Sequence, residues 1–490
     1  MTSEIASLLQ QAVVRHQAGD IAAARELYAS VLRRDPRQAD ALHLLGVICD
    51  QSGQHEAAVD LIERAIAQSP DAAEFHGNLG TALLALRRMD AAEAAYRRAI
   101  TLDPAYVEGY YNLGNLLRER GETIAAKELL ETALRLQPGH VHCRNNLAML
   151  LWEDLLDEAA AERHFRLLLA LAPDWAAAHM NHGLFRLASG AYAEGWAEYE
   201  WRWRNADFKE RDWSMGLPRW RGEALDGKGL LLWGEQGVGD QILYGTMLKD
   251  AQQRSRARMI VAVDRRLIGL YRRSLAGDGI TVVARGEMVD AVAQCPFGSL
   301  GRILRQSVSD FAGSGQYLAA DPARQQMLRQ RYRDLAGARR IVGIAWRSAN
   351  ADIGLHKSIP LETLLPALQR PDVFWVNLQY GDVVDEISRL QQAGVAILHD
   401  RGVDGLQDLD ALAAQVAALD AVVAVSSTTV HVAGALGIPT LLLLPRGRGR
   451  LWYWPAAGEA SRWYDCVRII RQEQPGDWSG TAQSLAVAMA

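Results

Sequence analysis

A repeating spacing of 34 residues dominates the first two hundred positions of the chain. Proline recurs at intervals of 34, 34, 34 and 35 residues, at Pro36, Pro70, Pro104, Pro138 and Pro173. A small residue keeps the same period at Gly46, Gly80, Gly114, Ala148 and Gly183. Small residues let two helices approach closely, and proline ends a helix because it has no backbone N–H to donate. The period therefore predicts a stack of helix pairs.

This pattern resembles the tetratricopeptide repeat, which also has a 34-residue period. Alanines recur twelve positions after the small residue, at Ala58, Ala92 and Ala126. The resemblance covers about residues 4–205 and implies about six helix pairs. We therefore predict an N-terminal tetratricopeptide-repeat α-solenoid over residues 1–205.

A column of asparagines accompanies the repeat, two positions before the small residue. Its members are Asn78, Asn112, Asn146 and Asn181, while Leu44 stands at this position in the second repeat. In this repeat family the position faces the concave groove, and the array is similar to the asparagine ladder of protein O-GlcNAc transferases. Amides that donate and accept suit an extended peptide backbone. The alternative is that these amides satisfy local helix ends or water.

The period breaks after residue 200, where residues 201–229 carry four tryptophans. We predict a packed, tryptophan-rich connector over residues 206–229. Its aromatic side chains either pack against the last repeat or stack on a sugar.

Beyond the connector, short apolar segments alternate with helical ones. The predicted strands are 230–233, 258–263, 280–284, 341–346, 373–378, 395–398, 420–425 and 440–444. Such alternation predicts parallel, doubly wound sheets, whose ligands bind beyond the carboxyl ends of the strands. The fold class is therefore α + α/β, with two Rossmann-like domains at residues 230–325 and 326–490.

A glycine-rich turn, GEQGVGDQIL at residues 234–243, follows the first predicted strand. Its glycines have the spacing of a Walker loop, but the turn lacks the lysine and the Ser/Thr that bind phosphate and magnesium. The dinucleotide fingerprint also fails, because Ile242 stands where the third glycine belongs. The Asp240 carboxylate suits a helix N-terminus and would repel a phosphate there. The turn is therefore not predicted to bind phosphate.

The string WGEQGVGDQI, with LPRW before it, is similar to the start of a bacterial glycosyltransferase module found behind tetratricopeptide repeats. That module is related to the heptosyltransferases, which have the two-domain GT-B fold. The resemblance implies that Asp240 is the general base that deprotonates a hydroxyl acceptor. A simple helix cap is the alternative, and it is compatible with catalysis. Glu235, Gln236 and Gln241 are further candidate substrate contacts.

The segment SSTTVHVAGALG, residues 426–437, offers hydroxyls and free backbone N–H groups at a helix start, which suits an anion. Relatives read DTSxxHLAGALG here and bind the phosphates of the donor. The implied donor contacts are Ser426, Ser427, Thr428, Thr429 and His431. Ser426 replaces the family's aspartate, and a histidine inside an apolar helix is also typical of a packed core.

Two cations and an arginine-rich loop complete the predicted donor side. Arg347 follows a predicted strand, and Lys357 matches a basic residue that pairs with the diphosphate in relatives. Either can stabilise the leaving phosphate without a metal. The alternative for each is a solvated surface cation. Arg448 and Trp452 lie in a loop that departs from the family pattern and are candidate substrate contacts.

Together with these residues, the resemblance implies an inverting, metal-independent glycosyltransferase without a cofactor, which moves a sugar from a nucleotide-sugar to Ser/Thr hydroxyls of a protein held by the repeats. Similarity around residues 346–348 and 357–358 to transferases that modify flagellin with nonulosonic acids makes flagellin a candidate acceptor and a CMP-sugar a candidate donor. A UDP-GlcNAc-type transferase is the main rival. Two further rivals are a peptide-binding scaffold with a degenerate transferase half and an enzyme acting on a lipid-linked glycan.

Charge, cysteine spacing and apolar segments indicate which classes of partner and which cellular location to expect. The net charge of −5 over 490 residues argues against nucleic-acid binding. The four cysteines have no metal or redox spacing and are expected to be reduced thiols. The N-terminal residues lack the pattern of a signal peptide, and the most apolar stretch reads as strand, helix and strand, so a soluble cytoplasmic protein without a membrane span is expected.

Overall fold

The computed structural model describes residues 2–208, 210, 212–311, 315–348, 350 and 353–489, with the side chains of residues 2 and 3 left aside. The predicted connector includes residues 209 and 211, which lie outside this range. The chain forms two compact units, Met1–Pro173 and Asp174–Ala490.

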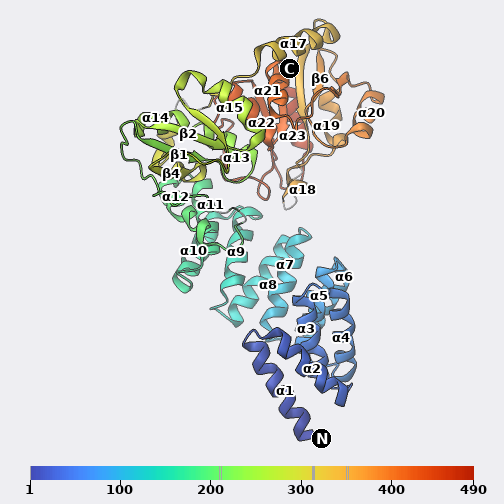
Figure 1. Cartoon of the computed structure of the whole chain (residues 1–490). Coiled ribbons are helices and arrows are strands. Elements are labelled where there is room, and N and C mark those ends of the chain that lie inside the picture. Colours follow the sequence, from blue (N-terminus) through green and yellow to red (C-terminus); the bar gives the residue numbers. More distant parts are fainter. Residues whose placement is uncertain are drawn as a thin grey trace. The chain divides into compact units, whose positions relative to one another are not determined.

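The first unit is a series of antiparallel helix pairs (Figure 1). Its helices are α1 (Thr2–Gln17), α2 (Ile21–Arg34), α3 (Ala39–Gln51), α4 (His55–Gln68), α5 (Ala73–Ala85), α6 (Met89–Leu102), α7 (Val107–Glu119), α8 (Thr123–Leu136), α9 (Val141–Glu153) and α10 (Glu158–Leu171). Each periodic proline lies two residues after the second helix of a pair. The predicted helical repeat is therefore confirmed.

The periodic small residues lie where the two helices of a pair touch. A Cβ added to Gly46 would lie 2.7 Å from Ile62 Cγ1, and one added to Gly80 would lie 2.6 Å from Tyr96 Cε1. Any larger side chain would push the helices apart. The 34-residue period thus records a packing constraint.

The second unit begins with one more helix pair, α11 (Ala176–Ala188) and α12 (Tyr192–Tyr199), followed by the short 3-10 helix η1 (Glu200–Arg204). Trp196 is fully buried in the main core of this unit, and its indole donates to the Arg305 carbonyl at 2.9 Å. The predicted boundary at residue 205 therefore falls inside this unit.

The first sheet has four parallel strands in the order β3-β2-β1-β4. They are β1 (Gly229–Trp233), β2 (Arg258–Val263), β3 (Thr281–Ala284) and β4 (Ala293–Pro296). The helices that follow or precede these strands are α13 (Val238–Gly245), α14 (Leu248–Ser255), α15 (Ile268–Ser274) and α16 (Gly301–Leu304). In the connector, Trp213 packs against Trp233 of β1.

The second sheet has six parallel strands in the order β10-β9-β8-β5-β6-β7. They are β5 (Arg340–Ala345), β6 (Val373–Asn377), β7 (Ile397–Leu398), β8 (Ala421–Val425), β9 (Thr440–Leu444) and β10 (Val467–Arg471). The accompanying helices are α17 (Pro322–Ala336), α18 (Gly354–Lys357), α19 (Leu361–Leu368), α20 (Val384–Gln392), α21 (Leu409–Ala417), α22 (Thr428–Leu436) and α23 (Ser479–Ala488).

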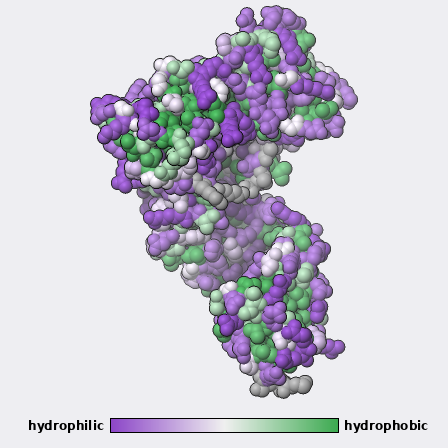
Figure 2. All heavy atoms as spheres, viewed as in Figure 1, coloured by the Kyte–Doolittle hydropathy of each residue, from purple (hydrophilic) through white to green (hydrophobic). Residues whose placement is uncertain are grey.

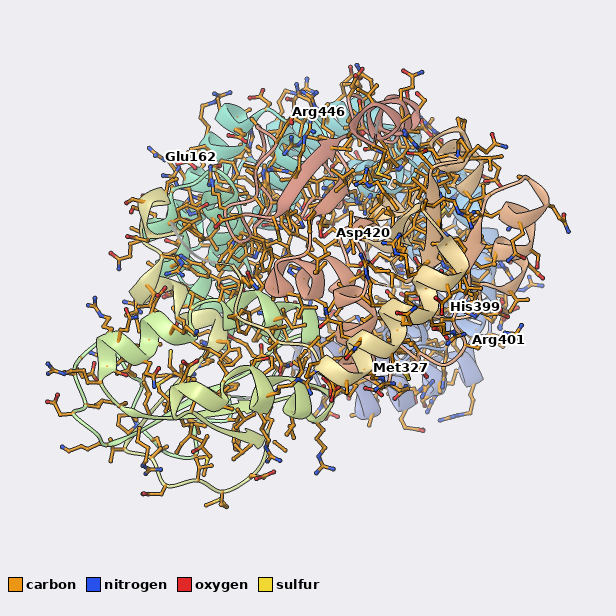
Figure 3. The ribbon with its side chains drawn as sticks, turned by 90° about the horizontal axis from the view of Figure 1, so that it is seen from above. Glu162, Met327, His399, Arg401, Asp420 and Arg446 are labelled. Carbon is orange, nitrogen blue, oxygen red and sulfur yellow. The ribbon has the colours of Figure 1, made fainter. Side chains whose placement is uncertain are left out.

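Ion pairs and buried apolar side chains fix α17 beside this sheet. Arg329 of α17 donates to Asp420 at 2.5 Å, and Asp420 also accepts from the backbone N–H of Ile341 at 2.8 Å. Figure 3 labels Asp420 and also Met327, an α17 residue whose side chain is exposed. The eight predicted strands all form, and β4 and β10 were not predicted.

No helix among the described residues is long and apolar enough to cross a membrane. Figure 2 shows hydrophilic side chains over much of the visible face, with hydrophobic ones scattered between them. The four cysteines are free: Cys49, Cys143, Cys295 and Cys466.

Candidate functional site

A cavity of about 590 Å³ in the second unit brings together side chains from both sheets. It lies beyond the carboxyl ends of β1, β5 and β8. The predicted site residues that line it are Gln236, Asp240, Lys357, Ser426, Ser427, Thr428, His431 and Trp452. The predicted residues that do not line it are Glu235, Gln241, Arg347, Thr429 and Arg448.

Asp240 stands in the first turn of α13, where its Oδ2 accepts the backbone N–H of Gly237 at 3.2 Å. The residue is therefore a helix cap, which was one of its two interpretations. Burial raises the pKa of its carboxyl to about 6, while the Gly237 hydrogen bond acts in the opposite direction. A carboxyl with this pKa is mostly ionised at neutral pH and still basic enough to accept a proton.

The glycine before this carboxylate lets two helix N-termini meet. A Cβ added to Gly239 would lie 3.2 Å from His431 Cδ2 and 3.4 Å from Thr428 Oγ1. The start of α13 thus packs directly on the start of α22. The glycine-rich turn serves this close approach.

Lys357 at the end of α18 is the cation of the cavity. Its side chain is only 4% exposed, and burial lowers the pKa of its ammonium, while the Asp240 charge raises it. The ammonium forms no ion pair or hydrogen bond with any residue that the structure describes. A buried cation without a partner is costly, and an anionic ligand would stabilise it.

Hydroxyls surround the N-terminus of α22, although they differ in availability. Ser427 is the N-cap, but its Oγ is buried and has no partner among the described residues. Thr428 lines the cavity, whereas Thr429 is 2% exposed and points elsewhere. Ser426 Oγ accepts the indole N–H of Trp454 at 2.8 Å, so its hydroxyl already has a structural partner. Ser427 and Thr428 are therefore the hydroxyls left for a ligand.

His431 is held by three aromatic residues. Its Nδ1 lies 3.2 Å from the Tyr464 hydroxyl, its Nε2 lies 3.3 Å from the Tyr453 hydroxyl, and its ring stacks on Trp454. Burial, followed by the Lys357 charge, lowers the pKa of His431 to about 3. The imidazole is therefore neutral at physiological pH. It is packed among aromatic side chains and also lines the cavity, while its role as a donor contact stays a prediction.

Glu235 and Gln241 were predicted as candidate substrate contacts, and both have structural partners instead. Glu235 is fully buried and pairs with Arg202, with Oε1 2.8 Å from Nη2. The same oxygen accepts the backbone N–H of Gly298. Gln241 is 3% exposed, and its Oε1 accepts the backbone N–H of Asp264 at 2.9 Å. Neither side chain reaches the cavity.

Arg347 and Arg448 also lie away from the cavity lining. Arg347 donates to the Asp382 carbonyl at 2.7 Å and pairs with Glu386 at 3.2 Å. Arg448 is partly exposed in the loop after β9. Gln236 differs from both, because it lines the cavity and donates to the Tyr199 hydroxyl at 2.5 Å.

Several cavity residues were not predicted. Met180, Leu184 and Tyr199 come from the last helix pair, whose sequence pattern indicates only helix packing. Arg266 follows β2 and is braced by Asp264, with Nε 3.0 Å from Oδ1. The rule that ligands bind after strand ends would have found Arg266, since the predicted strand ends at residue 263.

A smaller cavity of about 330 Å³ lies at the carboxyl ends of β6 and β7. Tyr380 lines both cavities, and Arg266 donates to the carbonyl of Leu406, which lines the smaller one. His399 and Arg401, labelled in Figure 3, belong to this second lining. The two cavities are therefore neighbours.

Some side-chain amides of the asparagine column already have hydrogen-bond partners within the protein. Burial lowers the pKa of His43 to about 4, so its neutral ring accepts at Nε2 from Asn78 at 2.8 Å. Asn146 donates to Asn115 at 2.9 Å. Asn112 is half-buried and has no hydrogen-bond partner among the described residues. Asn181, the last member of the column, lies on α11 of the second unit.

Comparison with known proteins identifies the repeats. Two models of the tetratricopeptide repeat match, one at residues 9–73 and 50–107 and the other at residues 95–128. The chain is 32% identical over 323 residues to Protein FlbA of Caulobacter vibrioides, a match that covers 62% of this chain and 53% of FlbA. The chain thus spans about half the length of this curated relative.

Solved repeat proteins resemble part of the chain. MamA is 24% identical to the chain, and the match covers 35% of this chain and 93% of the MamA chain, with a TM-score of 0.30. Pseudomonas aeruginosa PilF is 20% identical over 41% of this chain and 90% of its own, with a TM-score of 0.37. The matches to the two repeat models show that the protein contains tetratricopeptide repeats, which are typical of protein-binding scaffolds, and a region of parallel sheets follows them.

Proposed function

We propose that the second unit is an inverting glycosyltransferase of the GT-B type, whose donor phosphates bind beside Lys357 at the start of α22. The observation that carries the proposal is the Lys357 ammonium, which is 4% exposed, lines the cavity and forms no ion pair or hydrogen bond with a described residue, although the Asp240 charge acts on it. The free Ser427 hydroxyl and the backbone N–H groups of the first turn of α22 support the same anion.

Asp240 is the general base of this proposal. It removes the proton of an acceptor hydroxyl while the hydroxyl oxygen bonds to the anomeric carbon and the bond from that carbon to the phosphate oxygen breaks. The nucleotide leaves as an anion, and Lys357 stabilises its added charge without a metal. A pKa of about 6 makes the carboxylate available at neutral pH.

The smaller cavity suits the nucleoside of the donor. It adjoins the phosphate position through Tyr380, and its lining includes the His399 imidazole and the Arg401 guanidinium, which can bind ribose hydroxyls and base edges. Gln379 and Asp400 also line it, but both are buried and already hydrogen-bonded within the protein. These groups do not distinguish one base from another. A CMP-linked nonulosonic acid and a UDP-linked sugar therefore remain the two candidate donors.

The acceptor is proposed to be a protein. Met180, Leu184 and Trp452 give the cavity an apolar side that suits a peptide. The repeat array supports capture of such a chain, with Asn112 as the amide that has no other partner among the described residues. Flagellin is the candidate acceptor implied by the family resemblance.

A thermal-shift screen with CMP, UDP, GDP and ADP tests donor binding. We expect one nucleotide to raise the melting temperature of the wild type and Lys357→Gln to lose most of that shift. Lys249→Gln is the matched control, because Lys249 is exposed and pairs with Asp278. No shift with any nucleotide would instead favour the peptide-binding scaffold with a degenerate transferase half.

Catalysis is tested separately with Asp240→Asn. This variant should keep the nucleotide shift and lose transfer by about 10²- to 10⁴-fold, the usual contribution of a general base. Wild-type kcat/KM should fall as the pH drops through about 6, because the carboxyl becomes protonated. Unchanged turnover in the variant would refute the assignment of the base.

The scaffold alternative has one specific support. Ser426 replaces the family's aspartate, and its hydroxyl is engaged by Trp454. No carboxylate of this segment therefore reaches the donor. The nucleotide screen decides between the two functions, since a scaffold has no need of a nucleotide.

A further inference from the structure

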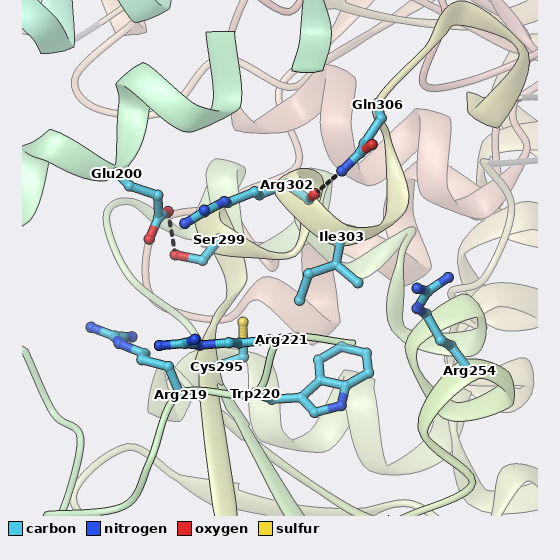
Figure 4. Close-up of a pocket in the computed structure, with 10 residues that line it drawn as sticks. All are labelled: Glu200, Arg219, Trp220, Arg221, Arg254, Cys295, Ser299, Arg302, Ile303 and Gln306. Carbon is cyan, nitrogen blue, oxygen red and sulfur yellow. Dashed lines mark hydrogen bonds between the residues drawn. The ribbon is translucent and has the colours of Figure 1, made fainter. Parts of the chain in front are cut away.

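A third cavity, of about 460 Å³, lies on the first-sheet side of the second unit and shares no lining residue with the cavity of Asp240. Four arginines line it, so we name it the arginine cavity (Figure 4). They are Arg219, Arg221, Arg254 and Arg302. Three segments supply them: the connector, α14 and α16.

The positive charge of the arginine cavity is largely uncompensated. Only Arg219 has an acidic partner, Asp212, at 2.9 Å, among the residues that the structure describes. Arg254 donates to the Gly222 carbonyl at 3.1 Å, and neither Arg221 nor Arg302 uses its guanidinium on any described residue. Guanidinium groups that converge on one cavity repel each other unless an anion binds between them.

Glu200, the one acidic residue among the described lining residues, can offset at most one of the four arginine charges. Glu200 Oε1 accepts from Arg202 at 2.8 Å and from Ser299 at 2.6 Å, but Arg202 also pairs with Glu235, so one negative charge of this cluster stays uncompensated. Burial, and next the Glu200 charge, raise the pKa of the Cys295 thiol well above its usual value. Cys295 is therefore a neutral part of the wall.

The arrangement separates two positive regions by an apolar one. Figure 4 shows Arg221 and Arg302 on the same side as Glu200, while Arg254 lies on the other side of Trp220 and Ile303. Trp220 is 2% exposed, and its indole donates to the Glu223 carbonyl at 2.8 Å, so it forms a fixed wall. A ligand of this shape has an anionic group at each end and a compact body between them.

We propose that the arginine cavity binds a small molecule that carries two or more phosphate groups. The planar guanidinium donates two parallel hydrogen bonds to a phosphate, which favours arginine wherever phosphate is recognised. The volume lies in the range of small-molecule pockets, about 300–1,000 Å³. An acidic protein segment is the weaker fit, because an extended chain needs an open groove. This site does not depend on the proposed glycosyl transfer.

Isothermal titration calorimetry of the full chain tests the proposal with two probes, fructose 1,6-bisphosphate and tripolyphosphate. The first carries separated phosphates and the second carries adjacent ones. We expect binding of at least one probe, weakened by salt, and about a tenfold loss of affinity in Arg302→Gln and in Arg254→Gln. Arg302→Lys keeps the charge but loses the two parallel guanidinium donors, so its affinity should lie between those of the wild type and Arg302→Gln.

Arg389→Gln is the matched control, because Arg389 is an exposed arginine on α20 that lines none of these cavities. Lys357→Gln should also leave the arginine-sensitive binding unchanged. The substituted arginines are exposed, so the variants should melt as the wild type does. Wild-type affinity for both probes in Arg221→Gln/Arg254→Gln/Arg302→Gln would overturn the proposal. Tighter, arginine-dependent binding of a poly-glutamate peptide would overturn it too.

Discussion

Replacing Asp240 by asparagine should stabilise the second unit, and the gain should grow with pH. Burial raises the pKa of this carboxyl to about 6, compared with an ordinary value of about 3.9. A shift of two pKa units corresponds to about 3 kcal/mol, and the partial exposure of the carboxylate to the cavity reduces this to about 2 kcal/mol. The ionised carboxylate therefore weakens the fold that supports it.

The sign of the pH dependence follows from proton linkage. Between the unfolded and folded pKa values the folded state binds more protons than the unfolded state. The contribution of this carboxyl to the free energy of unfolding is therefore largest below pH about 4 and is lost as the pH rises through about 6. Asparagine does not titrate and resembles the protonated acid in shape. The advantage of Asp240→Asn should therefore be below about 1 kcal/mol at pH 4.5 and should reach about 2 kcal/mol at pH 7.5.

Urea denaturation followed by tryptophan fluorescence measures this difference, because 13 of the 14 tryptophans lie in residues 174–490. Asp264→Asn is a control of opposite sign. Hydrogen bonds from Arg266 lower the pKa of Asp264, so that variant should lose stability at neutral pH and approach the wild type as the pH falls. An Asp240→Asn difference that stays constant from pH 4.5 to 7.5 would refute the reasoning.

Three further predictions concern the cavity, the core and the groove. Gly239→Ala should separate α13 from α22 and abolish the nucleotide-induced melting shift, whereas Gly237→Ala, whose Cβ would meet only Asp240 Oδ2 at 3.4 Å, should retain it. Glu235→Gln should lower the free energy of unfolding, measured in urea, by about 3–5 kcal/mol, because it leaves the buried Arg202 charge without its main partner. Glu459→Gln, which breaks an exposed ion pair with Arg468, should change that free energy little. Asn112→Ala should weaken capture of an extended peptide in a fluorescence-anisotropy titration without changing the melting temperature, whereas Asn146→Ala should lower that temperature because it removes the bond to Asn115. An Asn112→Ala chain that binds peptide as the wild type does would leave the groove without its proposed contact.

The repeats were predictable because the small residues at the contact between the two helices of a pair recur at a fixed spacing in the sequence. The strands were predictable where four or more apolar residues run together, as in Leu230–Trp233. β4 (Ala293–Pro296) escaped because Gln294 is a buried polar residue, whose amide oxygen accepts from the Trp233 indole at 2.7 Å. In β10 (Val467–Arg471) an arginine stands second and another last, which hides a short strand.

The cavity was predictable in part for a similar reason. Residues that follow strand ends meet at one edge of a parallel sheet, and this rule correctly brought Asp240, Lys357 and Thr428 to one cavity. The same rule selected Arg347, whose ion pair with Glu386 holds it elsewhere. Partners of this kind depend on side-chain geometry, which residue spacing does not contain. Tyr199 was missed because its helix belongs to a region interpreted only as scaffold.

The distribution of strain in the second unit bears on the choice between enzyme and scaffold. Three groups around one cavity are held at a cost to stability: the Asp240 carboxylate, the Lys357 ammonium and the Ser427 hydroxyl. Other buried polar atoms of this unit, such as Arg471 Nε and Thr481 Oγ1, also lack a hydrogen-bond partner among the described residues, so the Ser427 hydroxyl alone carries little weight. The Asp240 carboxylate and the Lys357 ammonium differ from these atoms, because a transferred proton and a bound anion would offset their costs. These two groups therefore support the proposed transferase over the peptide-binding scaffold.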